Sequence, residues 1–272
     1  MNKFFATMRF WRRLVAFLAI TILYSACMEV DILFHRRRPR IELINKWVPR
    51  WAKALLWIFG IHVHSHGPHI EGGGLYPSSD ERGVGRIFVF NHRSGVDIPV
   101  GLAIVLAHPI SRHDLATWPI LGRRARRVGT LFVDRESRRS GASVLRQIVD
   151  AIAAGEGIAM FPEGTSFPGD EVRDFKPGPF TSAERTGAQV VPMGLAYGDP
   201  AAYYYKESFM THMKRVGRLK RLDVAIEAGE PISVGGRSSM EVKEEAHVAV
   251  QELVNRARAR LEGRAVEAAV AT

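Results

Sequence analysis

The chain has 272 residues, of which 46% are hydrophobic and 24% charged, values typical of globular proteins. This composition excludes a disordered chain, a collagen-like chain and a polytopic membrane protein. The single cysteine, Cys27, can form neither an internal disulfide nor a four-cysteine zinc site. The formal net charge is +10.

The positive charge is concentrated at the amino-terminal end of the sequence. Residues 1–60 hold 11 basic and three acidic residues, so this segment carries +8 and the other 212 residues carry +2. A nucleic-acid-binding domain would spread its basic residues over its folded surface. Here they accompany apolar stretches, so we expect an anionic bilayer surface as the partner, and no nucleic acid.

Two apolar stretches predict a pair of helices in this segment. Residues 14–28 carry no charge, and as a helix they would span about 22 Å, less than the ~30 Å hydrocarbon core of a bilayer. Residues 47–61 contain three tryptophans, and the basic residues 35–40 separate the two stretches. We predict a two-helix membrane anchor over residues 1–60, inserted in one leaflet or lying along it. A tilted span by the first helix and a pair of buried core helices are the alternatives.

A secretion signal is a further alternative for this segment. Residues 24–27 loosely resemble a lipoprotein cleavage site, but Tyr24 stands where a small aliphatic residue is expected. Four arginines follow within 13 residues of Cys27, which works against export. We therefore expect the anchor to be retained at the cytoplasmic face of the inner membrane.

From residue 61 the sequence has the pattern of an α/β domain. Apolar runs predict strands at residues 61–66, 86–90, 130–133, 157–161, 189–194 and 222–226. Helical patterns cover residues 98–107, 137–154, 179–186 and 239–262. This alternation predicts a mostly parallel central sheet flanked by helices over residues 61–264, with catalytic loops at strand ends. We expect residues 265–272 to form a disordered tail.

The strand at residues 86–90 leads into a segment with His92 and Asp97. A neutral imidazole can accept a proton near pH 7, and a carboxylate on its other ring nitrogen fixes the tautomer. No serine or cysteine nucleophile is evident, so the attacking group would be a hydroxyl of the substrate. The alternative is a histidine that caps a helix with Asp97 in its first turn.

Two other strand ends carry candidate binding residues. The strand at residues 157–161 is followed by Glu163, Gly164 and Thr165, where the glycine lets the backbone approach a ligand closely. The strand at residues 130–133 ends in Asp134 and Arg135, a combination suited to binding a phosphate or a carboxylate.

Four segments in this order resemble the glycerolipid acyltransferase family, and most closely the bacterial 1-acyl-glycerol-3-phosphate (lysophosphatidate) acyltransferases. The first family block, Asn-His followed by four residues and Asp, is matched by Asn91, His92 and Asp97. The resemblance covers about residues 60–232, and its remaining matches are residues 132–135, 161–165 and 191–193, with residues 175–180 after the third block.

The resemblance implies acyl transfer from acyl-CoA or acyl-carrier protein to the free hydroxyl of a lysolipid, without a metal or other cofactor. With lysophosphatidate as acceptor the product is phosphatidate, as in phospholipid biosynthesis. The resemblance assigns catalysis to His92, Asp97 and Glu163. It assigns substrate binding to residues that lie in or beside the family blocks: Asn91, Arg135, Gly164, Thr165, Ser166 and Lys176.

One position departs from the family pattern. The third block often ends in an arginine associated with the phosphate of the acceptor, and Ser166 stands there instead. Arg135, Arg173 or Lys176 can replace that arginine, or the acceptor is another lysolipid such as lyso-ornithine lipid. A catalytically silent lipid-binding protein is a remote alternative, which the intact set of His92, Asp97 and Glu163 disfavours.

Two other clusters have less specific interpretations. The histidines at positions 62, 64, 66 and 69 suggest a zinc site, but a partly exposed strand leading toward the one before His92 is the favoured interpretation. The basic run at residues 123–127 suits contact with lipid head groups or with the phosphates of CoA, or it forms a solvated helix face.

Overall fold

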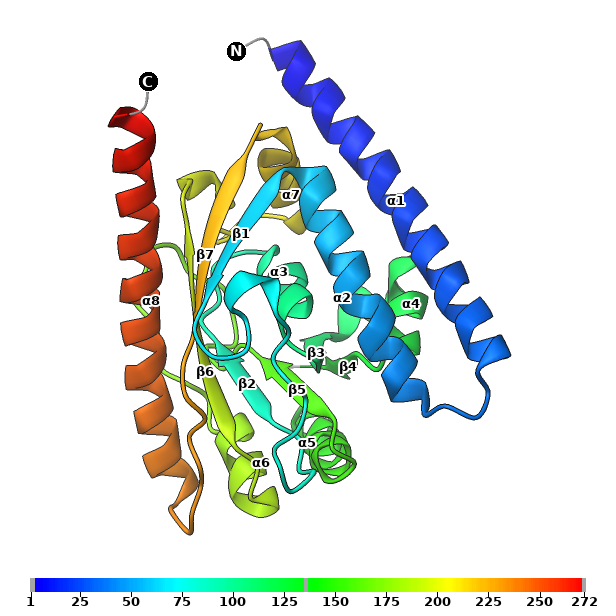
Figure 1. The fold of residues 1–272 in the computed structure, drawn as a ribbon, viewed down its shortest axis with the longest axis vertical. Coiled ribbons are helices and arrows are strands. Elements are labelled where there is room, and N and C mark those ends of the chain that lie inside the picture. Colours follow the sequence, from blue (N-terminus) through cyan, green and yellow to red (C-terminus); the bar gives the residue numbers. More distant parts are fainter. Residues whose placement is uncertain (1–2, 135–136, 271–272) are drawn as a thin grey trace.

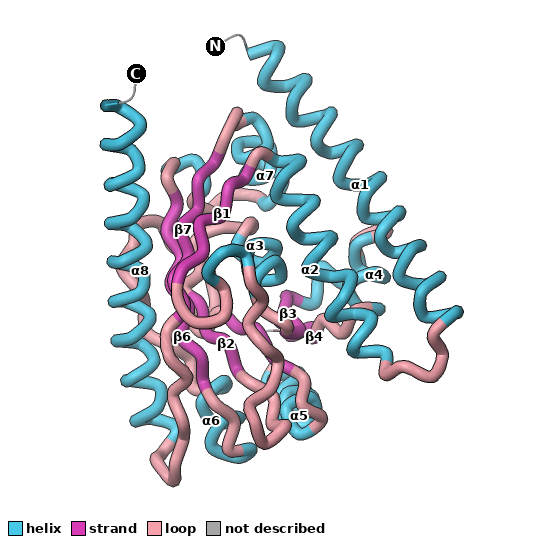
Figure 2. Tube along the Cα trace, in the orientation of Figure 1, coloured by secondary structure: helices cyan, strands magenta, loops and turns pink. Residues whose placement is uncertain are grey.

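A seven-stranded sheet forms the centre of the molecule in the computed structural model, which describes residues 3–134 and 137–270 (Figures 1 and 2). The strand order is β1-β7-β6-β2-β5-β3-β4. All neighbouring strands run parallel except β6 and β7, which are antiparallel. The predicted mostly parallel sheet is therefore confirmed. The strands are β1 (Ile61–His66), β2 (Ile87–Phe90), β3 (Ala107–Arg112), β4 (Leu131–Val133), β5 (Gly157–Met160), β6 (Val190–Tyr197) and β7 (Leu222–Ala228).

Helices cover both faces of the sheet. Residues of α2 (Arg40–Phe59) and α3 (Asp97–Ile104) pack with Phe88 and Phe90 of β2 on one face. Residues of α5 (Arg138–Ala153), α6 (Gly178–Thr186) and α8 (Ser239–Val270) pack with Ile87 and Val89 on the other. Successive side chains of a strand point to opposite faces, so β2 contributes to both apolar clusters. All four of its residues are fully buried.

Helix α8 lies against β6 through a glycine. A Cβ atom on Gly194 would lie 2.4 Å from the main-chain nitrogen of Val254, closer than such atoms approach. Glycine at this position therefore lets the helix backbone contact the strand. The close approach buries Ala257 and Leu261 of α8 against Ala196 and Ala225 of the sheet.

The first two helices form the predicted pair, joined by the basic residues 35–39 (Figure 1). Helix α1 (Lys3–Phe34) extends well beyond the uncharged run, to about 48 Å at 1.5 Å per residue. Among the described residues it is the one helix long and apolar enough to cross a membrane. Much of its apolar surface is exposed, including Phe4, Trp11 and Phe34.

Arg13 attaches α1 to the α/β domain. Its buried guanidinium donates hydrogen bonds to the carbonyl oxygens of Ile58 (2.9 Å), Gly217 (3.1 Å) and Leu219 (2.5 Å). The last two lie at the end of α7 (Phe209–Arg218), where helix carbonyls have no intrahelical partner and carry partial negative charge. An arginine within an apolar helix thus faces the domain.

Three local predictions are wrong. The helix expected at residues 98–107 ends at Ile104, and β3 begins at Ala107, because a proline and three polar residues hid this short strand. Helix α7, half of whose residues are polar or charged, was not predicted. The disordered tail expected at residues 265–272 is helical through Val270, since no glycine or proline interrupts residues 265–270. Residues 271–272 lie outside the described residues.

The short helices are α4 (Leu121–Arg127), η1 (Glu71–Gly73), η2 (His113–Thr117) and η3 (Pro200–Ala202).

Replacing Arg13 tests the attachment of α1. Arg13→Leu removes the donors to the carbonyls of Gly217 and Leu219, whereas Arg9 still donates to the carbonyl of Arg218 (2.6 Å). We expect the free energy of unfolding to fall by about 2–3 kcal/mol. Thermal unfolding of the full chain in detergent micelles measures this change. Arg12→Leu is the matched control because Arg12 is exposed on the same helix turn. Equal stability of the two variants would contradict the role given to Arg13.

Candidate active site

His92 and Asp97 meet at the carboxyl end of β2, as the sequence predicts. The Nδ1 atom of His92 lies 2.6 Å from Oδ2 of Asp97. A carboxylate can only accept this hydrogen bond, so Nδ1 carries the proton and Nε2 is left as the basic nitrogen. The His92 side chain is 15% exposed and that of Asp97 is fully buried. The pair therefore presents one basic nitrogen at the surface of the domain.

The fold holds the Asp97 carboxylate at several points. Its Oδ2 also accepts the main-chain N–H groups of Arg93 (2.6 Å) and Ser94 (2.8 Å), and its Oδ1 accepts the Tyr197 hydroxyl (2.5 Å). Burial, together with the Asp97 charge, raises the pKa of Tyr197 well above its usual value, so this phenol remains a donor. Asp97 is also the first residue of α3, where a negative charge is favourable.

Glu163, in the turn that follows the neighbouring strand β5, fixes the backbone of His92. Its Oε1 accepts the main-chain N–H of His92 (2.7 Å), and both of its oxygens bind the fully buried guanidinium of Arg93 at 2.9 and 3.0 Å. Arg93 in turn donates to the carbonyl oxygens of His92 (2.6 Å) and Glu171 (2.7 Å). The Glu163 side chain is fully buried, so it orients His92 from inside the protein.

Aromatic and main-chain contacts complete the setting of His92. The ring of Phe161 stacks on the imidazole, with 4.5 Å between the ring centroids and 29° between the planes. The main-chain N–H of Phe167 donates to the carbonyl of His92 (3.0 Å). Together with Glu163, these contacts restrict both the ring and the backbone of His92.

Two residues predicted to bind substrate have their polar atoms engaged inside the fold. The amide of Asn91 is fully buried and exchanges two hydrogen bonds with the main chain of Leu195, at 2.9 and 2.8 Å, which join β2 to β6. The hydroxyl of Ser166 is buried and donates to the carbonyl of Tyr204 (2.6 Å). Both side chains therefore point into the protein, and their part in substrate binding stays a prediction.

The other predicted binding residues lie around the turn that follows β5. Gly164 has φ +80°, and a Cβ there would lie 2.6 Å from Nζ of Lys176, so the lysine side chain crosses directly over this glycine. The N–H of Gly164 donates to Phe161 in the turn (3.0 Å). Thr165 and Lys176 are exposed. Arg135, the remaining candidate, lies outside the described residues.

His212 is a second buried histidine at the site, which the sequence analysis missed. Its Nε2 atom accepts the main-chain N–H of Gly95 (3.1 Å) and lies 3.2 Å from the Ser94 hydroxyl. Burial, together with the nearby Arg215 guanidinium, lowers the pKa of His212 to about 4. The neutral ring thus supports the turn between His92 and Asp97. A histidine in a polar, unpredicted helix gave no sequence signal.

The arrangement suits general-base catalysis on a hydroxyl supplied by a substrate. The Ser94 hydroxyl is fully buried, and Ser166 is bonded to the main chain, so neither can attack a substrate. Within residues 3–134 and 137–270, no group of three histidine, cysteine or acidic side chains is placed to hold a metal ion. His64 instead pairs with Asp223 at 2.8 Å.

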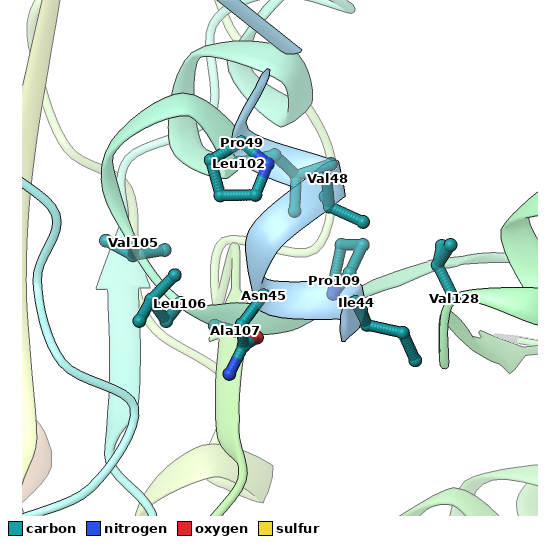
Figure 3. A pocket seen from close by; sticks show the side chains of 10 residues that line it. All are labelled: Ile44, Asn45, Val48, Pro49, Leu102, Val105, Leu106, Ala107, Pro109 and Val128. Atoms are coloured by element: carbon teal, nitrogen blue, oxygen red, sulfur yellow. The ribbon is translucent and has the colours of Figure 1, made fainter. Parts of the chain in front are cut away.

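A small apolar cavity lies between α2, α3 and β3, and none of its lining residues belongs to the site (Figure 3). It contributes no acid, base or nucleophile to the site. Its lining is almost entirely aliphatic: Ile44, Asn45, Val48, Pro49, Leu102, Val105, Leu106, Ala107, Pro109 and Val128.

The depressed pKa of His212 predicts a loss of stability in mild acid. The unfolded chain binds a proton near pH 6.5 and the folded chain only near pH 4, so the free energy of unfolding falls as the pH falls through this window. The loss is at most about 3 kcal/mol. Unfolding in detergent, followed between pH 7 and pH 4, measures it.

A pair of variants isolates the contribution of His212. His212→Gln keeps an acceptor for Gly95 but cannot titrate, so its stability should depend less on pH in this window. His62→Gln is the control because His62 is exposed. An unchanged pH dependence in His212→Gln would contradict the assignment.

Comparison with known proteins identifies related chains. A family model described as Acyltransferase matches residues 77–196. The lyso-ornithine lipid O-acyltransferase of Pseudomonas aeruginosa is 30% identical over 171 residues, which cover 61% of this chain and 66% of that protein. The enzyme of the same name from Rhizobium meliloti is 27% identical over 263 residues, covering 89% of this chain and 82% of that one. A 1-acyl-sn-glycerol-3-phosphate acyltransferase from Neisseria gonorrhoeae is 28% identical over 149 residues, covering 53% and 58%.

A solved structure shares the fold. The crystal structure of the 1-acyl-sn-glycerophosphate (LPA) acyltransferase from Thermotoga maritima superposes with a TM-score of 0.70 at 21% sequence identity, covering 94% of this chain and 96% of that one. The matched family segment contains His92, Asp97 and Glu163, the three residues whose contacts define the site. On these grounds residues 77–196 are a domain of the acyltransferase family.

Proposed function

We propose that this protein transfers an acyl group from a thioester donor, acyl-CoA or acyl-carrier protein, to the free hydroxyl of a membrane lysolipid. The observation that carries the proposal is the contact of 2.6 Å between His92 and Asp97, which leaves Nε2 of His92 as an accessible base. The related lipid acyltransferases and the long apolar helix α1 support membrane association. We place the reaction at the cytoplasmic face of the inner membrane.

In the proposed reaction, Nε2 of His92 removes the proton from the acceptor hydroxyl as its oxygen attacks the thioester carbonyl. The new C–O bond forms and the C–S bond breaks, and the imidazolium returns its proton to the departing thiolate. Asp97 stays ionised throughout and stabilises the imidazolium. Glu163 and Arg93 act on the backbone of His92 and hold it in position.

The proposed acceptor is lysophosphatidate, with phosphatidate as the product. Lys176 lies over Gly164 beside the site and offers a cation for the acceptor phosphate. Lyso-ornithine lipid is the second candidate, favoured by the inward orientation of Ser166, where the family often has an arginine. Four of the related proteins, including one aligned over 89% of this chain, are lyso-ornithine lipid O-acyltransferases.

Thiol release from one acyl-CoA, measured with a panel of lysolipids in detergent micelles, tests the function and the choice of acceptor. Lysophosphatidate should give the fastest release if Lys176 binds its phosphate, and Lys176→Ala should then raise KM for it more than kcat falls. Faster release with lyso-ornithine lipid would establish the second candidate. His92→Ala should reduce release by about 100- to 10,000-fold, the usual contribution of a general base. His62→Ala is the control, and full activity of His92→Ala would refute the mechanism.

The buried pair of Arg93 and Glu163 yields a separate prediction. Glu163→Gln leaves the Arg93 charge buried without its counterion, so we expect the free energy of unfolding to fall by about 3–5 kcal/mol and kcat to fall with it. The double variant Arg93→Met, Glu163→Gln removes both charges and should recover much of the stability but not kcat, because the carbonyl of His92 has lost a donor. Thermal unfolding and kcat are measured on all variants. Recovery of kcat together with stability would show that the pair does not position His92.

A further inference from the structure

The fold joins two basic segments that are far apart in the sequence. Arg127 of α4 donates to both carboxylate oxygens of Glu29 on α1, at 2.6 and 2.5 Å. Arg40, at the start of α2, donates to the carbonyl of Arg127 (2.7 Å). These contacts place α4 beside the loop between α1 and α2, and in Figure 1 α4 lies behind this hairpin. We call the combined region the basic surface: Arg36, Arg37, Arg38, Arg40, Arg123, Arg124, Arg126 and Arg127.

The basic surface holds more positive charge than its own carboxylates balance. Within the described parts of the chain, Glu29 is the one carboxylate hydrogen-bonded to any of its eight arginines. Glu42 is a second nearby acid in the first turn of α2, and Asp31 is already engaged by Lys46 and Trp47. The arginines of the loop are exposed. Such an excess of charge favours a partner with many negative groups.

Exposed apolar side chains flank the basic surface on two sides. Val30, Leu33 and Phe34 at the end of α1 are 52%, 54% and 78% exposed. Trp118 and Ile120, just before α4, are 36% and 42% exposed. Arginines next to exposed aromatic and aliphatic residues are typical of surfaces that bind at the boundary between lipid head groups and acyl chains. A soluble polyanion would use the charges but not the apolar border.

The same segment leads to the catalytic turn. The ring of Trp118 contacts that of Phe209 at the start of α7, with 5.3 Å between the centroids. Phe209 in turn packs directly on Gly95, where a Cβ would lie 2.7 Å from the phenyl ring. Gly95 lies between His92 and Asp97 in the sequence. A surface that binds α4 and Trp118 therefore also fixes the direction in which the turn between His92 and Asp97 faces.

From this arrangement we infer that the basic surface docks onto anionic lipid head groups, with α4 as a contact contributed by the α/β domain itself. Helix α1 supplies apolar attachment, and α4 supplies a second point that fixes the orientation of the domain. The turn with His92 then faces the bilayer, so that a lysolipid reaches the base from the membrane. This use of the orientation rests on the proposed function.

The test is the partition of the full chain between neutral and anionic vesicles in direct competition. Because α1 contributes to binding of both vesicles, the ratio of bound protein isolates the electrostatic part. Arg123→Gln, Arg124→Gln removes two charges and leaves Arg126, bonded to Ala116, and Arg127, bonded to Glu29, in place. We expect the preference for phosphatidylglycerol over phosphatidylcholine vesicles to fall about 30-fold at low salt.

A charge-matched control uses arginines on other elements. Arg185→Gln, Arg256→Gln changes two exposed residues on α6 and α8, and in Figure 1 α8 lies at the opposite side of the molecule from α4. This variant should keep the preference for anionic vesicles. Equal losses in the two double variants would mean that net charge alone acts, and would overturn the docking surface.

Two further readouts separate this inference from its rivals. An unchanged vesicle preference with a raised KM for acyl-CoA in Arg123→Gln, Arg124→Gln would overturn it in favour of a donor-phosphate site. The catalytically disabled His92→Ala chain should partition as the unmodified chain does. Failure of the proposed function would therefore leave the partition result standing, and failure of docking would leave the thiol-release result standing.

Discussion

The buried carboxylate of Asp97 is the interaction on which the site depends. A charge removed from water is costly unless hydrogen bonds replace its hydration, and Asp97 accepts them from His92, from two main-chain N–H groups and from Tyr197. These donors come from the end of β2, the turn before α3 and the end of β6. The sheet must therefore be complete before the carboxylate is satisfied, and the orientation of His92 follows from the same bonds.

Other buried side chains around this carboxylate hold different parts of the site in place. Glu163 and Arg93 hold the His92 backbone, Asn91 joins β2 to β6, and neutral His212 supports the turn from α7. Arg93 is held at high cost, because its Nε is buried without a partner in the described structure. Such a residue contributes little net stability, so its presence is better explained by the geometry it imposes on His92.

The sequence predicted the parts of the fold that have strong periodic or motif signals. The apolar strand before Asn91 and the spacing from His92 to Asp97 located the base and its partner, because both follow local rules of strand and turn. It did not predict that Asn91 and Ser166 point inward, since a polar residue in a motif shows its chemistry but not its direction. His212 and Arg93 were missed because their contacts come from long-range packing; Gly95 and His212 are 117 positions apart in the sequence.

The attachment of α1 through Arg13 also has a consequence for the order of events during synthesis. The carbonyl of Gly217 that receives the Arg13 guanidinium is 204 residues later in the chain. At 5–20 residues per second a ribosome needs roughly 10–40 s to make that partner. During this interval the apolar helix exists without its binding site on the domain. The nascent chain can thus reach a lipid surface first, so that the domain assembles around a helix already at its destination.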